Sequence, residues 1–141
     1  MKKIHVLLVE DNEGDILLTT EAFEESAIPT KLSIVKNGEE AIDFLFKRGR
    51  YKDVERPDLV LLDINLPIKN GHQVLMEVKS NDDTRNIPII VLTTSDAQQD
   101  INKAYFNYAN SYITKPLDIK EFVVAIQQIE GFWLELAKLS K

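Results

Sequence analysis

Short runs of aliphatic and β-branched residues recur along the chain, separated by stretches in which apolar residues return at helical spacing. Runs of this kind are typical of strands that are buried on both faces of a sheet. We expect strands over residues 4–9, 32–35, 59–62, 87–92 and 111–114. The helical spacing predicts helices over residues 13–26, 38–46, 71–80, 95–108 and 119–136.

Regular alternation of strands and helices predicts βαβ units and a parallel sheet with helices on both faces. Right-handed crossovers and short connections limit such a chain to doubly wound topologies. We therefore expect an α/β fold with a five-stranded parallel sheet, flavodoxin-like in its (βα)5 order. No internal repeat or low-complexity linker interrupts the pattern, so residues 1–141 are expected to form a single domain with no output domain.

Polar residues mark several of the expected helix starts. Asn37 followed by Glu40, and Ser95 followed by Gln98, resemble capping boxes. Asp118 is placed to cap the last helix. The polar segment 47–56 is expected to be a loop.

Composition excludes several classes of site and partner. Hydrophobic residues make up 44% and charged residues 28% of the chain, as in ordinary globular domains. The absence of cysteine excludes disulfides, thiolate metal sites and a cysteine nucleophile. A net charge of −6 disfavours nucleic acid and anionic membranes as partners. No apolar run is long enough to span a bilayer and no secretory signal opens the sequence, so we expect a cytoplasmic protein.

The polar residues at the ends of the expected strands carry the candidate chemistry. In an open α/β sheet, ligands bind outside the carboxyl ends of the strands. The residues there are Glu10, Asp11, Asp63, Thr93 and Lys115. Each alone is an ordinary strand-end or surface residue. Together, three carboxylates favour a hard cation such as Mg²⁺, and a lysine beside a hydroxyl suits the oxygens of a phosphoryl group.

Glycine-rich phosphate loops are not part of this chemistry. Gly14 stands alone after the first expected strand, so the chain has neither a Walker A loop nor a dinucleotide-binding fingerprint.

In four segments the chain resembles the receiver domain of two-component response regulators. These are Val9–Asn12, Leu61–Pro67 with Gly71, Ile89–Ser95 and Tyr112–Pro116, in the family's order. The loop 47–56, the run Leu-Thr-Thr-Ser at 92–95 and Gly-Phe-Trp-Leu-Glu at 131–135 also resemble small receiver-only regulators that partner phytochrome-type histidine kinases.

The resemblance implies a role for each strand-end residue. Asp63 would be the phosphoacceptor, and Thr93 and Lys115 would contact the phosphoryl oxygens. The implied Mg²⁺ ligands are Glu10, Asp11, Asp63 and the carbonyl of Asn65. Tyr112 would be the aromatic switch that follows Thr93. Two positions depart from the common pattern: Glu10 stands where many receivers have aspartate, and Thr94 is bulkier than the residue often found there.

We therefore expect a response regulator that takes a phosphoryl group from a histidine kinase or phosphotransfer protein in a Mg²⁺-dependent reaction. It would signal to a protein partner through a face formed by the fourth helix, fifth strand and fifth helix. The alternative is an enzyme, a Mg²⁺-dependent phosphatase or phosphotransferase with an aspartyl-phosphate intermediate. Asn65 argues against it, because such enzymes typically place an acid two residues after the nucleophile. We expect no enzyme activity beyond the protein's own phosphorylation and slow dephosphorylation.

Two sharper expectations concern the end of the chain. The resemblance implies a cis peptide bond between Lys115 and Pro116, although only about 5–6% of such bonds are cis. Self-association as a homodimer is expected through the face formed by the fourth helix, fifth strand and fifth helix. Its aromatic residues are Tyr105, Phe106, Tyr108, Phe132 and Trp133; the alternative is that Phe132 packs under the C-terminal tail, residues 137–141.

Overall fold

The computed structural model describes residues 3–26, 28–115 and 118–139, with side chains left undescribed at Ile119 and from Phe132 onward. Strands and helices alternate along this part of the chain, as expected. Their bounds are β1 (Ile4–Val9), α1 (Glu13–Glu24), β2 (Thr30–Val35), α2 (Gly38–Leu45), β3 (Leu59–Leu62), α3 (Gly71–Lys79), β4 (Ile89–Thr93), α4 (Gln98–Phe106), β5 (Ser111–Thr114) and α5 (Ile119–Leu139).

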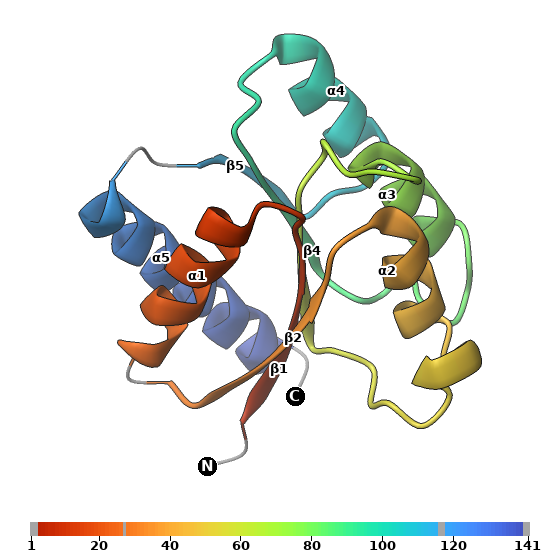
Figure 1. Ribbon diagram of the computed structural model, residues 1–141, viewed down its shortest axis with the longest axis horizontal. Coiled ribbons are helices and arrows are strands. Elements are labelled where there is room, and N and C mark those ends of the chain that lie inside the picture. The colour runs from red at the N-terminus through yellow and green to blue at the C-terminus, as the bar shows by residue number, and fades with distance from the viewer. Residues whose placement is uncertain (1–2, 27, 116–117, 140–141) are drawn as a thin grey trace.

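The strands form one parallel sheet in the order β2-β1-β3-β4-β5, which confirms the predicted fold class. Helices α1 and α5 cover one face, while α2 and α3 cover the other (Figure 1). Helix α4 lies beside α3 at the upper end of that second face in the view of Figure 1. The register pairs Val9 with Leu62 and Leu62 with Val91, so β1, β3 and β4 end at the same edge of the sheet.

The core is divided by the sheet into two apolar clusters. Every residue of β1, β3 and β4 is buried, because each strand has side chains in both clusters. Leu7 and Val60 pack with α2 and α3, whereas Leu8 and Leu61 pack with α1 and α5. This double burial is the physical reason that these strands consist of aliphatic runs.

Asparagine caps begin three of the helices. The side chains of Asn12, Asn37 and Asn70 accept hydrogen bonds from the backbone N–H groups of Asp15, Glu40 and Gln73 respectively. Asp118 accepts from the N–H of Glu121 at 2.9 Å, so the predicted caps at Asn37 and Asp118 are confirmed. Glu40, however, reaches back to the N–H of Lys36 rather than completing a capping box at Asn37.

The predicted capping box at Ser95 is wrong. Helix α4 begins at Gln98 with Ala97 in the cap position, and Ala97 makes no side-chain cap bond. The hydroxyl of Ser95 instead donates to the carboxylate of Asp100 at 2.6 Å. In a capping box this hydroxyl would accept a backbone N–H, whereas here it donates to a carboxylate, which is a charge-assisted hydrogen bond.

Several further boundaries differ from the sequence expectation. Strand β2 begins at Thr30 rather than at residue 32, α1 ends at Glu24 rather than at residue 26, and α5 ends at Leu139 rather than at residue 136. Strand β4 begins at Ile89 instead of residue 87, because Pro88 has no N–H to donate to a neighbouring strand. The segment 47–56 is not wholly irregular, since Gly49–Tyr51 forms a short 3₁₀ helix in which Tyr51 N–H bonds to the carbonyl of Arg48.

Some expectations fall outside the described residues. Pro116 is one of these, so the predicted cis bond is not described. The same holds for the side chains of Phe132 and Trp133. Among the helices that are described, none is both long enough and apolar enough to cross a bilayer.

Candidate phosphoryl and cation site

Backbone hydrogen bonds place the candidate residues at one edge of the sheet. The N–H of Asp63 bonds to the carbonyl of Val9 at 3.1 Å, so Asp63 sits beside Glu10 where β1 and β3 end. The N–H of Lys115 bonds to the carbonyl of Thr93 at 2.7 Å, which joins the ends of β5 and β4. The ladder of backbone hydrogen bonds thus continues one residue beyond β3 and β5. These two residues are Asp63 and Lys115, so the backbone pairing itself positions both candidate side chains.

Three carboxylates gather at this edge. Oxygen atoms of Glu10, Asp11 and Asp63 all lie within 4.8 Å of one another. Glu10 is 2% exposed and Asp63 is 8% exposed, whereas Asp11 faces solvent. One oxygen of Asp63, Oδ1, accepts the N–H of Ile64 at 2.7 Å, which fixes the orientation of its carboxylate.

Lys115 supplies the positive charge in this cluster. Its side chain is nearly buried, and its Nζ donates to Oε1 of Glu10, to Asp15 Oδ2 at 2.9 Å and to Asp63 Oδ2 at 3.3 Å. Each of these contacts brings together residues of different elements. One ammonium therefore bridges the ends of β1 and β3 and the first turn of α1.

Burial and charge shift the ionisation of these groups. Burial raises the pKa of Glu10 to about 7; the hydrogen bond from Lys115 opposes the shift, and the charge of Asp63 adds to it. Burial by itself lowers the pKa of Lys115, but the hydrogen bonds with Glu10 and Asp15 and the charge of Asp63 raise it on balance. Lys115 is therefore charged at neutral pH, and an additional cation near Glu10 would favour its ionised form.

The donor set suits a hard cation. It offers carboxylate oxygens without sulfur or imidazole nitrogen, and Mg²⁺ is typically held by one or two carboxylates together with waters. The solvent-facing position of Asp11 leaves room for such waters. Asn65, the other predicted ligand, lies two residues beyond Asp63 and is exposed in the loop between β3 and α3.

The two predicted switch residues lie next to this cluster. Thr93 is fully buried at the end of β4, and its Oγ1 accepts the N–H of Ser95 at 3.4 Å. Tyr112 on β5 is half-buried, and its hydroxyl donates to the carbonyl of Ser95 at 2.8 Å. Both residues thus contact Ser95, at the start of the loop between β4 and α4. Thr94, beside them, is exposed.

Sequence reasoning missed Asp15 as a partner of Lys115. An acid in the first turn of a helix is usually explained by the helix dipole, so its type and position carry no distinct signal. Helix α1 begins at Glu13, directly after the strand-end acids, and this short connection brings Asp15 back over the edge of the sheet.

Gly71 sets the approach of α3 to the site. A Cβ atom at this position would lie 2.2 Å from the carbonyl oxygen of Asp63 and 2.8 Å from Cα of Ile64. Only glycine allows the N-terminus of α3 to pack directly against the backbone of Asp63. The sequence motif includes Gly71, but its contact with Asp63 depends on how α3 packs and is not visible in the motif.

Comparison with known proteins gives a consistent family signal. Residues 6–127 match the model of the response regulator receiver domain. The response regulator Rcp1 of Synechocystis is 42% identical over 134 residues, which cover 95% of this chain and 91% of Rcp1.

Two solved structures extend the comparison. The phosphorylated cyanobacterial phytochrome response regulator RcpA superposes with a TM-score of 0.90 at 41% identity, covering 94% of this chain and 95% of RcpA. The Mn²⁺-bound form of Rcp1 superposes with a TM-score of 0.87 at 42% identity, covering the same shares of the two chains.

Proposed function

Since the chain belongs to the response regulator receiver domain family, we propose that Asp63 is the residue that accepts the phosphoryl group. The observation that supports it most is the position of this carboxylate. Asp63 ends a central strand, is nearly buried, and lies between two further acids and the ammonium of Lys115. As a response regulator, the protein acts in two-component signalling; the assignment of roles to individual residues is our proposal.

Glu10, Asp11, Asp63 and the carbonyl of Asn65 are proposed to hold Mg²⁺. When bound, the ion neutralises charge on the phosphoryl group and on the carboxylates. The chain's own contribution is to hold the acids together at the ends of β1 and β3, where the N–H of Ile64 fixes the orientation of the Asp63 carboxylate.

In the proposed reaction, a carboxylate oxygen of Asp63 attacks the phosphorus of a kinase phosphohistidine. The new P–O bond forms as the P–N bond breaks, and the imidazole nitrogen keeps the electron pair and takes a proton from solvent. Such transfers depend mainly on alignment and charge neutralisation. Lys115 already reaches Oδ2 of Asp63 and is therefore placed to bind a phosphoryl oxygen attached there.

Thr93 and Tyr112 are proposed to convert phosphorylation into a change of surface. The phosphoryl group would draw the hydroxyl of Thr93 inward, and Tyr112 would follow into the space it leaves. This biases a two-state face made of α4, β5 and α5. The family is one of signalling proteins, which favours this function over the aspartyl-phosphate enzyme considered as the alternative.

We propose that the protein acts in the cytoplasm with a sensor histidine kinase or phosphotransfer protein as its partner. The likeness to Rcp1 and RcpA favours a phytochrome-type kinase. Residues 1–141 are proposed to act as one receiver domain. Incubation with a phytochrome-type kinase and an unrelated histidine kinase would test the pairing. Faster transfer from the unrelated kinase would contradict it.

We also propose a homodimer through the α4–β5–α5 face. Phe106 is 81% exposed at the end of α4, and Tyr105 and Tyr108 are exposed beside it. A stable interface would bury more than about 1,000 Å² in total. Sedimentation at tens of micromolar, with and without a phosphoryl mimic, should show a dimer that Phe106→Glu weakens. A monomer under all conditions would contradict this.

Intact mass after incubation with a small phosphodonor and Mg²⁺ tests the phosphoacceptor directly. The protein should gain one phosphoryl group, and Asp63→Asn should gain none. Asp58→Asn is a matched control, because Asp58 precedes the same strand at its opposite end. Labelling of Asp63→Asn, or equal labelling in excess chelator, would contradict the proposal.

A further inference from the structure

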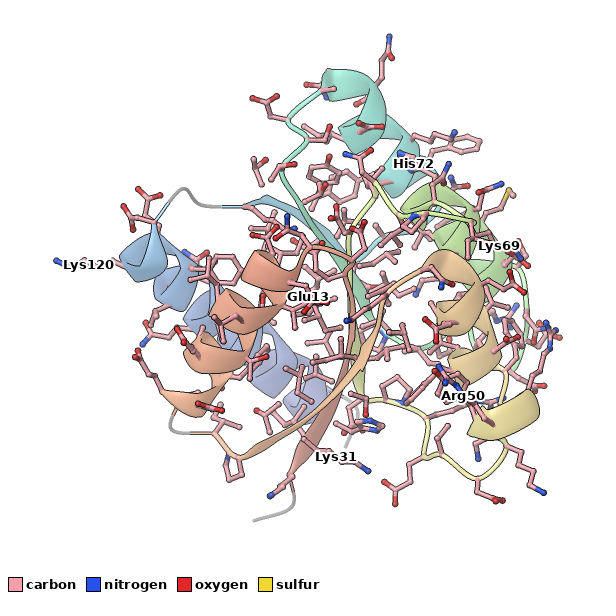
Figure 2. All side chains as sticks on the ribbon, in the orientation of Figure 1. Glu13, Lys31, Arg50, Lys69, His72 and Lys120 are labelled. Carbon is pink, nitrogen blue, oxygen red and sulfur yellow. The ribbon has the colours of Figure 1, made fainter. Side chains whose placement is uncertain are left out.

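His72 is a buried histidine that the phosphoryl chemistry does not use. It is the second residue of α3, is 6% exposed, and lies between α3 and α4 (Figure 2). Its Nε2 is 3.0 Å from Oδ1 of Asp100, in the first turn of α4. Because Asp100 is ionised and can only accept, Nε2 carries the proton in this contact.

The other ring nitrogen of His72 shows that packing alone does not explain the residue. Nδ1 is buried and has no hydrogen-bond partner in the part of the chain that the structure describes. A buried polar atom without a partner is unfavourable, and an apolar side chain would fill the same space without that cost. We therefore explain the presence of a histidine here by the hydrogen bond that its Nε2 donates to Asp100.

Asp100 also contacts the loop between β4 and α4. Its second oxygen, Oδ2, accepts the hydroxyl of Ser95 at 2.6 Å. The hydrogen bonds from Ser95 and His72 lower the pKa of Asp100 and keep it ionised. One carboxylate thus holds α3 on one side and Ser95 on the other.

Ser95 in turn contacts both switch residues. Its carbonyl accepts the hydroxyl of Tyr112 at 2.8 Å, and its N–H points to Oγ1 of Thr93 at 3.4 Å. A displacement of Thr93 toward Asp63 must therefore disturb the position of Ser95. The hydrogen bonds from His72 through Asp100 oppose that disturbance.

Helix α4 has little else to hold its N-terminus in place. No side chain caps it, and Ala104, near its other end, is its one buried residue. An element with so few buried contacts opens at low free-energy cost. The hydrogen bonds of Asp100 are therefore the main contacts that hold the N-terminal end of α4 against the rest of the protein.

We propose, on the basis of the phosphoacceptor role proposed for Asp63, that His72 is a positioning residue for the switch. Through Asp100 it holds Ser95, and with it the hydroxyl of Tyr112, in this arrangement. Loss of the Nε2 contact lowers the cost of moving the β4–α4 loop. By linkage, the protein without this contact binds a phosphoryl group or its mimic at Asp63 more tightly.

Titration with beryllium trifluoride in Mg²⁺, followed through the amide signals of Thr93 and Ser95, tests this inference. His72→Phe keeps a ring but removes the donor, and should bind the mimic about fivefold more tightly than the unchanged protein. His72→Gln places an amide nitrogen where Nε2 was and should restore the original affinity. His72→Asn places it near Nδ1 instead and should behave like His72→Phe.

Controls separate this role from a general loss of stability. Gln98→Ala alters a side chain that bonds to Asn102 within the same helix and should leave the affinity unchanged. Asp100→Ala removes the bonds to both His72 and Ser95 and should tighten binding at least as much as His72→Phe does. The double variant should gain nothing over Asp100→Ala, since the contact between His72 and Asp100 is already lost in that variant. A purely structural role would lower resistance to urea while leaving the affinity of the folded protein unaltered.

Failure of the inference and failure of the proposed function give different results. If the unchanged protein does not bind the mimic, or if Asp63→Asn binds it equally well, the proposed function is overturned. If the unchanged protein binds and His72→Phe binds with equal affinity, the role of His72 is overturned. Should His72→Phe not fold, the ¹⁵N shifts of His72 in the unchanged protein decide: they should move on saturation, and constant shifts overturn the inference.

Discussion

The edge of the sheet around Asp63 and the region around α4 are built in opposite ways. Around Asp63, every residue of β1, β3 and β4 is buried and one ammonium bridges three elements. In α4, Ala104 is the one buried residue and the helix N-terminus lacks a side-chain cap. Phosphoryl transfer needs fixed geometry, whereas a switch needs an element that moves at low cost, and the two regions meet these needs separately.

The largest predicted effect is on phosphorylation at the edge of the sheet around Asp63. Lys115→Met should slow phosphorylation by a small phosphodonor by about 100-fold, because the group that neutralises the phosphoryl oxygens is lost. Intact mass against time measures the rate. Lys36→Met is the control, since Lys36 pairs with Glu13 at an exposed position. A rate for Lys115→Met close to that of the control would remove Lys115 from the proposed mechanism.

Substitutions in the sheet should also affect stability more than substitutions in α4. Leu61→Ala, in the middle of β3, should lower the free energy of unfolding by about 2–5 kcal/mol through lost burial and a cavity. Phe106→Ala, on exposed α4, should change it by less than about 0.5 kcal/mol. Urea denaturation measures both variants. Equal losses would show that the α4 region is as firmly packed as the sheet.

Two glycines sharpen this comparison. Gly71→Ala should cost about 1–3 kcal/mol, because the new Cβ would lie 2.2 Å from the carbonyl oxygen of Asp63 and α3 would have to move. A Cβ at Gly131 in α5 would meet no atom within 4 Å among the described residues, so Gly131→Ala should raise stability by up to about 1 kcal/mol. Thermal denaturation checks the opposite signs. A stable Gly71→Ala protein would mean that α3 can withdraw from the site.

The edge of the sheet around Asp63 is largely predictable from the sequence. Strands buried on both faces need aliphatic runs, and the polar residues that follow them mark where β1 and β3 end. The hydrophobic pattern alone therefore assigns Glu10, Asp11 and Asp63 to one edge of the sheet. Pro88 misleads, because it has no N–H to donate, although its carbonyl still accepts the N–H of Val60 at 2.9 Å.

The α4 region is harder to predict because its contacts depend on how helices pack. His72 and Asp100 are 28 residues apart, and nothing in their local sequence indicates that they meet. Ser95 matches the capping pattern, yet its hydroxyl bonds to Asp100. Tyr105 likewise accepts the N–H of Tyr112 through its hydroxyl at 3.1 Å, a contact between α4 and β5 that no sequence period reveals.

The smallest predicted effect concerns the loop that leads from Asp63 to α3. Ile68 has a left-handed backbone with φ of 69°, and its side chain is 73% exposed. This conformation is unfavourable for a β-branched residue, whereas asparagine adopts it readily. Exposure means that the side chain recovers little of this cost through burial.

Ile68→Asn should therefore raise the free energy of unfolding by about 0.5–1 kcal/mol, since the strain is relieved with little loss of packing. Ile34→Asn is the matched control, because Ile34 is also exposed but lies within β2, where asparagine is disfavoured. That variant should be less stable than the unchanged protein. Urea denaturation of the pair gives the answer: if Ile68→Asn also loses stability, the packing of the Ile68 side chain contributes more than its left-handed backbone conformation costs.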